Sequence, residues 1–142
     1  MTPVPAKAKL AFIKMIMFNY LIGDNDAHGK KFFLLYKNKK PILAPAYDIL
    51  STEIYPKLTK KMAMKIGSSY EKEWINKSNW QALCDDINYS FTMFKKEFLK
   101  MCEILPKIIN NEIDPLDKRI EKDIPNKIKE VTLENIKNLK LP

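Results

Sequence analysis

Residues 21–32 read LIGDNDAHGKKF, and residues 43–51 read LAPAYDILS. The first stretch places a carboxylate, Asp26, in a polar turn directly after an apolar segment. A second carboxylate, Asp48, follows 22 residues later, after a predicted pair of short strands. A phosphoryl-transfer site uses this layout, because one aspartate accepts a hydroxyl proton and another holds magnesium on the phosphates of ATP. The two stretches therefore decide both the expected fold and the candidate chemistry.

Size and composition predict one mainly helical domain. The chain has 142 residues, 46% of them hydrophobic, which is enough for one core, so residues 1–142 are interpreted as a single domain. Three glycines against nine prolines favour helices with stiff connections over a glycine-turned β-sandwich. The longest apolar run, residues 10–22, is 13 residues long, whereas a bilayer span needs about 20. A buried central helix is therefore expected, and no membrane partner.

The two cysteines, Cys84 and Cys102, both lie in segments with helical patterning. The apolar run at residues 10–22 also lacks the basic start and the small-residue cleavage site of a secretory signal. We therefore expect buried thiols and a reducing, cytoplasmic location, with a disulfide between the two cysteines as the alternative.

The formal net charge of +8 is unevenly distributed. Residues 1–41 hold eight lysines against two aspartates, a net charge of +6, whereas residues 113–142 hold seven basic and six acidic groups. The excess lies beside the candidate site, where it would favour a polyanion such as ATP, RNA or DNA. A solvated lysine-rich surface is an equally good interpretation.

The pattern of apolar residues predicts a helix over 8–22 that ends at Gly23, followed by a polar loop over 24–31. Residues 32–36 and 41–44 read as a β-hairpin around a four-residue turn, 37–40. A short apolar piece at 62–66 is expected to be extended.

The second half of the chain reads as helical. Ser78 or Asn79 is expected to cap a helix that reaches Ile87. A second helix presents one amphipathic face, formed by Phe94, Phe98, Met101 and Leu105. Asp114 and Pro115 suit the start of a third helix, and Pro125 separates it from a last one. The fold class is thus mainly α with a small hairpin that holds the polar loop.

Protein kinases place a catalytic aspartate on a loop after a buried helix, a metal-binding asparagine five residues later, and a second metal-binding aspartate after a hairpin. Asp26 and Asp48 occur in that order with those elements. At these residues the sequence resembles the HipA family of bacterial toxin Ser/Thr kinases. Its catalytic loop usually reads Gly-x-x-Asp-x-His-x-Lys-Asn-Phe and its magnesium segment Leu-x-Pro-x-Tyr-Asp, and residues 62–65 are similar to a block that often follows. The resemblance covers about residues 8–105.

The resemblance implies the helical C-lobe of a protein-kinase-like HipA-type fold, with ATP and Mg²⁺ as cofactors. Asp26 would be the general base for a Ser/Thr hydroxyl, and Asp48 a magnesium ligand. His28 matches the loop histidine, for which shaping the loop is favoured over direct chemistry. Lys30 matches the loop lysine and, like Lys31, is a candidate phosphate contact.

Two departures from the family pattern stand out. Lys31 occupies the position of the metal-binding asparagine, and an ammonium has no lone pair for magnesium. Only seven residues precede the helix at 8–22, so the N-lobe that grips ATP is not in this sequence and the chain is interpreted as split or truncated. An N-terminal kinase lobe on a separate chain, or a homodimer, is therefore expected to complete the site and to cover an exposed apolar face at the hairpin.

Three functions follow as hypotheses. The first is a C-terminal fragment of a HipA-like toxin Ser/Thr kinase, inactive alone, that with its N-lobe would phosphorylate a protein such as an aminoacyl-tRNA synthetase. The second is a non-catalytic, degenerate kinase lobe that binds a HipB-like antitoxin or a related protein. The third is a basic helical nucleic-acid binder, which only the charge supports; in the kinase interpretation nucleic acid is met only indirectly, through the antitoxin. Residues 106–142 are expected to be a helical extension.

Overall fold

The computed structural model describes residues 4–116 and 123–142, with the side chains of 113–116 left out of the description. Its helices are α1 (Ala6–Ile22), α2 (Lys77–Asp86), α3 (Phe91–Leu116) and α4 (Asp123–Lys137), and its strands are β1 (Leu34–Lys37) and β2 (Lys40–Leu43). Short 3₁₀ turns lie at Gly29–Lys31, Thr52–Ile54 and Lys72–Trp74. The fold is therefore mainly helical with one small sheet, as the sequence predicts.

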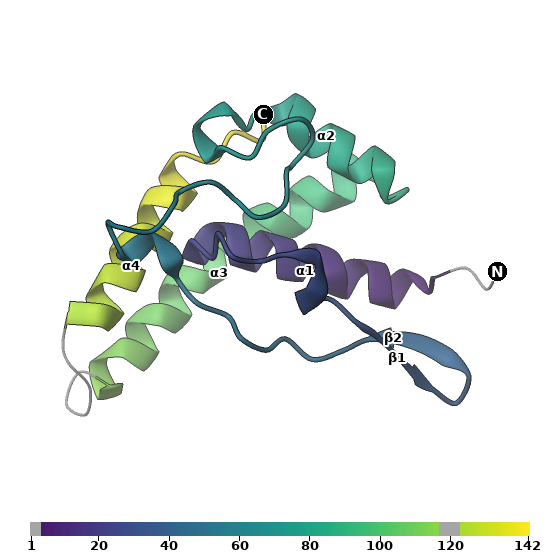
Figure 1. Cartoon of the computed structure of the whole chain (residues 1–142), viewed down its shortest axis with the longest axis horizontal. Helices are drawn as coiled ribbons and strands as arrows, with labels where there is room; N and C mark the ends of the chain where they lie inside the picture. The colour runs from purple at the N-terminus through teal and green to yellow at the C-terminus, as the bar shows by residue number, and fades with distance from the viewer. Residues whose placement is uncertain (1–3, 117–122) are drawn as a thin grey trace.

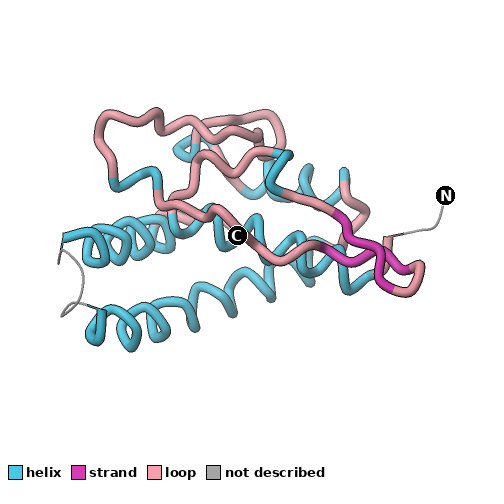
Figure 2. The backbone as a smooth tube through the Cα atoms, turned by 60° about the horizontal axis from the view of Figure 1, so that its bottom comes forward, coloured by secondary structure: helices cyan, strands magenta, loops and turns pink. Residues whose placement is uncertain are grey.

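Helix α1 is the centre of the arrangement. It contacts α3, α4 and β2 (Figure 1), and its residues Ile13, Met17 and Leu21 are fully buried. The hairpin extends past the helices at one end, and the long loops gather on one side of them (Figure 2). This arrangement leaves the polar loop after α1 between the helices and the hairpin.

An aromatic cluster forms the core between α1, α2 and α3. Trp80, Phe94 and Phe98 are fully buried, and Tyr20 of α1 packs edge-on against Trp80 with ring centroids 4.9 Å apart. Phe98 also packs edge-on against Trp80 at 5.2 Å. The predicted amphipathic face of the second helix is thus buried at Phe94, Phe98 and Leu105, since burial of apolar surface drives the packing.

The hairpin differs from the prediction in its turn. The strands are antiparallel, pairing Leu34 with Leu43 and Lys37 with Lys40, so only Asn38 and Lys39 form the turn. Both have positive φ, 51° and 63°, which is the two-residue geometry that matches the twist of the flanking strands. The predicted four-residue turn is wrong because this tight turn lets both strands pair fully.

The start of one helix and one segment expected to be extended also differ. Helix α2 is capped by Asn76, not by Ser78 or Asn79: the Asn76 side chain accepts from the Ser78 N–H at 2.9 Å, and the Asn79 side chain accepts from the Asn76 N–H at 3.0 Å. This reciprocal pair satisfies amides that the helix start leaves free. The segment 62–66 is not a strand; only Ile66 forms an isolated bridge, with Ser69.

The helix expected to begin at Pro115 does not begin there. Helix α3 runs through Asp114 and Pro115 to Leu116, and α4 begins at Asp123, so Pro125 lies in its first turn rather than before it. Proline costs a helix one hydrogen bond, and the packing of a long amphipathic helix outweighs that loss. The rest of the predicted third helix falls on residues 117–122, outside the described part of the chain.

The structure also describes the two cysteines. Cys84 and Cys102 are free thiols, the first buried and the second half-buried. Among the residues that the structure describes, no helix is long and apolar enough to cross a membrane.

Candidate functional site

The polar loop begins where Gly23 ends α1. Gly23 has φ 78°, in the left-handed region, and the next amide, of Asp24, donates to the Asn19 carbonyl at 2.9 Å. A Cβ at this position would lie 2.8 Å from Cγ1 of Val131 and 2.9 Å from Cβ of Glu53. Glycine is therefore required both by its backbone angle and by the close packing of α4, and it fixes the direction in which the loop leaves the helix.

Asp24 ties the loop to the segment that follows Asp48. Its carboxylate is buried; Oδ1 accepts from the Asp26 N–H at 3.0 Å, and Oδ2 accepts from the Leu50 N–H at 3.3 Å. Thr52 adds a second tie, since its Oγ1 accepts from the Asn25 N–H at 3.0 Å and donates to the Gly23 carbonyl at 3.1 Å. Two segments far apart in the sequence are thereby held side by side.

Asp26 and Asp48 meet on either side of one lysine. Lys31 Nζ lies 3.3 Å from Asp26 Oδ2 and 3.6 Å from Asp48 Oδ2, and it donates to the Asp48 carbonyl at 3.0 Å. The Lys31 side chain is only 6% exposed, whereas those of Asp26 and Asp48 are 58% and 57% exposed. The two predicted aspartates are thus brought together, with a buried cation between them and open solvent on their other side.

The ionisation of this cluster follows from burial and charge. Burial lowers the pKa of Lys31, but the attraction of Asp24, Asp26 and Asp48 outweighs it, so the pKa is raised overall. Burial raises the pKa of Asp24, against the lowering effect of the Leu50 N–H and of the Lys31 ammonium. Lys31 is therefore charged at neutral pH and neutralises part of an acidic cluster.

His28 and Lys30 lie in the same loop but outside this cluster of charges. The His28 N–H donates to the Asp26 carbonyl at 2.8 Å, and the His28 carbonyl accepts from the Lys31 N–H at 3.0 Å, so the backbone of His28 shapes the loop. Its Nδ1 is buried, with no hydrogen-bond partner within the described residues. Lys30 is exposed, and its carbonyl accepts from the Tyr47 hydroxyl at 3.1 Å.

Magnesium does not fit this arrangement as it stands. Mg²⁺ takes oxygen ligands at about 2.0–2.1 Å, and the group between the two carboxylates here is an ammonium, which has the same sign of charge and no lone pair. In the described part of the chain, no group of three or more His, Cys, Asp or Glu side chains is arranged to hold a metal ion. The expected role of Asp48 as a magnesium ligand thus has no support from the geometry while Lys31 keeps its place.

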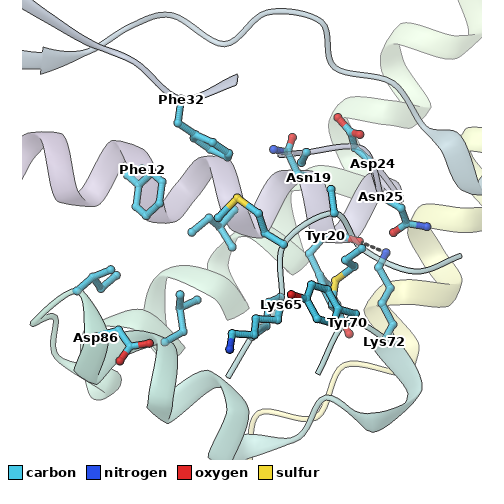
Figure 3. Close-up of a pocket in the computed structure, with 18 residues that line it drawn as sticks. Phe12, Asn19, Tyr20, Asp24, Asn25, Phe32, Lys65, Tyr70, Lys72 and Asp86 are labelled. Atoms are coloured by element: carbon cyan, nitrogen blue, oxygen red, sulfur yellow. Dashed lines mark hydrogen bonds between the residues drawn. The ribbon is translucent and has the colours of Figure 1, made fainter. Parts of the chain in front are cut away.

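A cavity of about 430 Å³ lies behind the loop, between α1 and the 62–72 segment (Figure 3). Its walls are mostly apolar, and Asp24 and Asn25 contribute from the loop side. Lys72 at its edge donates to the Tyr20 carbonyl at 2.6 Å and pairs with Glu53. Neither Asp26 nor Asp48 lines this cavity, so the two predicted site carboxylates lie at the open surface outside it.

The sequence reasoning missed Asp24, Thr52 and Tyr47 as parts of the site. Asp24 follows the helix-ending glycine directly, and aspartate at such a position commonly accepts from the amide two residues on, as it does here from Asp26. That signal could have found it. The role of Thr52 depends on the pairing of two distant segments, which no local pattern announces.

The comparisons with known proteins agree with this fold. The family model described as the HipA-like C-terminal domain matches residues 1–116, so the chain belongs to this family. The chain is 33% identical over 99 residues to the putative kinase Y4mE of Sinorhizobium fredii, covering 70% of this chain and 24% of that protein. It is 27% identical over 118 residues to the serine/threonine-protein kinase toxin HipA of Shewanella oneidensis, covering 80% of this chain and 27% of that one.

A solved structure gives the same fold. A chain of the Shewanella oneidensis complex of HipA, HipB and operator DNA superposes with a TM-score of 0.78 at 20% identity, covering 92% of this chain and 30% of that chain. The resemblance to the HipA family is thus confirmed. The chain spans about a quarter of the length of these curated relatives, between 24% and 27%.

Proposed function

We propose that this chain is the C-terminal lobe of a two-lobed HipA-like kinase assembly, which a second polypeptide completes by docking on the hairpin side. The observation that carries the proposal is an apolar surface beside the candidate site. We call it the hairpin face; it consists of Phe33, Leu35, Ile42 and Tyr47, whose exposed fractions run from 40% to 48%, and Leu35 lies opposite Ile42 on the same side of the hairpin. Contiguous exposed apolar groups of this kind usually mark a protein interface.

The hairpin face has a defined shape on which a partner could dock. Phe33 and Tyr47 stack with ring centroids 5.5 Å apart and nearly parallel planes. The Tyr47 hydroxyl is fixed by its hydrogen bond to the Lys30 carbonyl. The face is therefore tied directly to the loop that carries Asp26, so a lobe docked there would lie next to the candidate catalytic side chain.

In such an assembly the chemistry would be transfer of the ATP γ-phosphoryl group to a protein Ser or Thr hydroxyl. The hydroxyl oxygen forms the new bond to phosphorus, ADP leaves, and the hydroxyl proton passes to Asp26, whose carboxylate is open to solvent. The second lobe would bring ATP, because in kinases of the type that the family resemblance implies, the loop that grips the phosphates belongs to the N-lobe. From the resemblance to the family we propose that the substrate is an aminoacyl-tRNA synthetase and that a HipB-like antitoxin restrains the kinase activity.

A second candidate is a non-catalytic lobe that binds an antitoxin or a related protein. The contacts of Lys31 with both Asp26 and Asp48 favour it, since they use the two carboxylates that catalysis would need. In this function the hairpin face still docks a protein partner, but no phosphate is transferred.

The test is calorimetry with ATP, performed on the chain alone and mixed with the polypeptide encoded directly upstream, followed by phosphotransfer assays. The proposal predicts ATP binding and phosphotransfer in the mixture only, with phosphotransfer lost in Asp26→Asn. Leu35→Asp on the hairpin face should abolish complex formation, whereas Leu99→Asp, the same change at an exposed position of α3, should not. A complex that forms without phosphotransfer would favour the second candidate, and no complex at all would overturn the first.

A further inference from the structure

Lys31 is the most unusual residue of the candidate site. Its ammonium is surrounded by oxygens: the Asp48 carbonyl at 3.0 Å, Asp26 Oδ2 at 3.3 Å, Asp48 Oδ2 at 3.6 Å and Asp24 Oδ2 at 4.0 Å. The side chain is 6% exposed, although it belongs to a chain whose surface is rich in lysine. A lysine is rarely buried unless its charge is paired, and here three carboxylates share the pairing.

The position of Lys31 in the sequence suggests a role for its buried charge. Protein-kinase loops carry a metal-binding asparagine five residues after the catalytic aspartate, and that position is Lys31 here. In kinases that asparagine and the aspartate after the hairpin hold a divalent ion. In this chain the Lys31 ammonium lies beside the aspartate after the hairpin, within 3.6 Å of Asp48 Oδ2.

We propose that Lys31 is a fixed, protein-borne cation that takes the place of the metal ion, holding the Asp26 loop to the Asp48 segment and excluding divalent metals. This inference rests on the kinase-like placement of the two aspartates that the proposed function uses, and not on phosphate transfer itself. Its test does not involve the second lobe, so the two proposals can fail separately.

The charges around Lys31 explain why one lysine is enough to hold the segments. Asp24, Asp26 and Asp48 would repel one another without a cation, and Lys31 reduces the charge of the cluster from −3 to −2. Asp48 has φ 52°, in the left-handed region, and its carbonyl accepts directly from Lys31 Nζ. The lysine thus stabilises a strained backbone position as well as the carboxylates.

The same contacts explain the exclusion of metal. A divalent ion that bridged Asp26 and Asp48 would have to approach within a few ångströms of the Lys31 ammonium, which cannot coordinate it and repels it. Replacing the lysine by asparagine removes the repulsion and supplies an amide oxygen next to two carboxylates. Oxygens of these types suit Mg²⁺ and Mn²⁺.

The experiment is a Mn²⁺ titration followed by calorimetry and by the thermal unfolding midpoint. The wild type and Lys30→Asn, a matched change at the exposed neighbour, should show no saturable Mn²⁺ binding. Lys31→Asn should bind one Mn²⁺ with an affinity at least tenfold above the weakest that the titration detects, and its unfolding midpoint should rise with Mn²⁺. Lys31→Asn/Asp48→Asn should lose both effects.

Equal Mn²⁺ affinity in the wild type and Lys31→Asn would overturn the proposal, as would a Lys31→Asn variant that folds and binds no Mn²⁺. If Lys31→Asn does not fold, the Mn²⁺ titration of the wild type tests the proposal. A saturable Mn²⁺ site in the wild type that Asp48→Asn abolishes would refute the exclusion of metal. If the wild type has no such site and Lys31→Asn fails to fold, both results support the role of Lys31 as the cation that holds the two segments.

Discussion

Replacing Gly23 by alanine tests whether the loop direction depends on this one residue. Gly23 has φ 78°, and a non-glycine residue in the left-handed region costs about 1–2 kcal/mol. The added Cβ would lie 2.8 Å from Val131 Cγ1 and 2.9 Å from Glu53 Cβ, and overpacking of this kind costs roughly 1–3 kcal/mol. Together these terms predict that Gly23→Ala lowers the free energy of unfolding by about 2–5 kcal/mol, a large part of the 5–15 kcal/mol typical of a domain.

Gly29→Ala in the same loop is the matched control. Its Cβ would meet only the Met64 sulfur, at 3.8 Å, an ordinary van der Waals contact. That change should leave the free energy of unfolding within about 1 kcal/mol of the wild type, because a compatible alanine mainly restricts the unfolded chain. Urea titration followed by the fluorescence of the buried Trp80 measures both variants. A Gly23→Ala variant as stable as Gly29→Ala would refute the reasoning.

Three further outcomes are expected. Phe98→Ala, at a fully buried ring, should cost about 3–5 kcal/mol in urea unfolding, whereas Met93→Ala, 47% exposed on the same helix, should cost less than about 1 kcal/mol; similar losses would contradict the assigned core. Asn76→Ala should cost about 1 kcal/mol and lower the helical circular dichroism, because it removes the N-cap of α2; an unchanged midpoint would argue against the capping box. Burial raises the pKa of Cys102 to about 11, so its alkylation by iodoacetamide should be slow at pH 8 and rise roughly tenfold per pH unit towards pH 10, while a flat rate would contradict this pKa.

Local chemistry made part of this fold predictable from sequence. Gly23 follows an apolar helix, and the structure ends α1 there with the glycine in the left-handed region. The alternation of apolar stretches around a lysine-rich turn predicted the hairpin, and the four-residue spacing of Phe94 and Phe98 predicted a buried helix face. These features depend on residues close together in the sequence, which is why the sequence reveals them.

The remaining features depend on contacts that form only when the chain is folded. The cap at Asn76 competes with Ser78 and Asn79, and only the reciprocal bond with the Asn79 side chain selects it. The helix through Pro115 persists because of packing elsewhere along α3, which a local helix-breaking rule does not include.

In the candidate site, too, some features could be predicted from the sequence and others depend on contacts in the folded chain. The order of Asp26, the hairpin and Asp48 predicted that the two aspartates belong to one site, and the structure brings them to a common lysine. The sequence also showed that Lys31 occupies the position where a metal ligand is expected. It did not predict where the Lys31 ammonium lies in the folded chain. That position results from the ties that Asp24 and Thr52 make between distant segments.

The Lys31 ammonium lies between Asp26 and Asp48, at the place where a metal ion would bridge them. Crystals of the chain grown in millimolar Mn²⁺ show which cation is there, through an anomalous difference map at the manganese edge. We expect side-chain density for Lys31 between the two carboxylates and no anomalous peak there. A manganese peak bridging Asp26 and Asp48, with Lys31 turned out to solvent, would contradict this expectation.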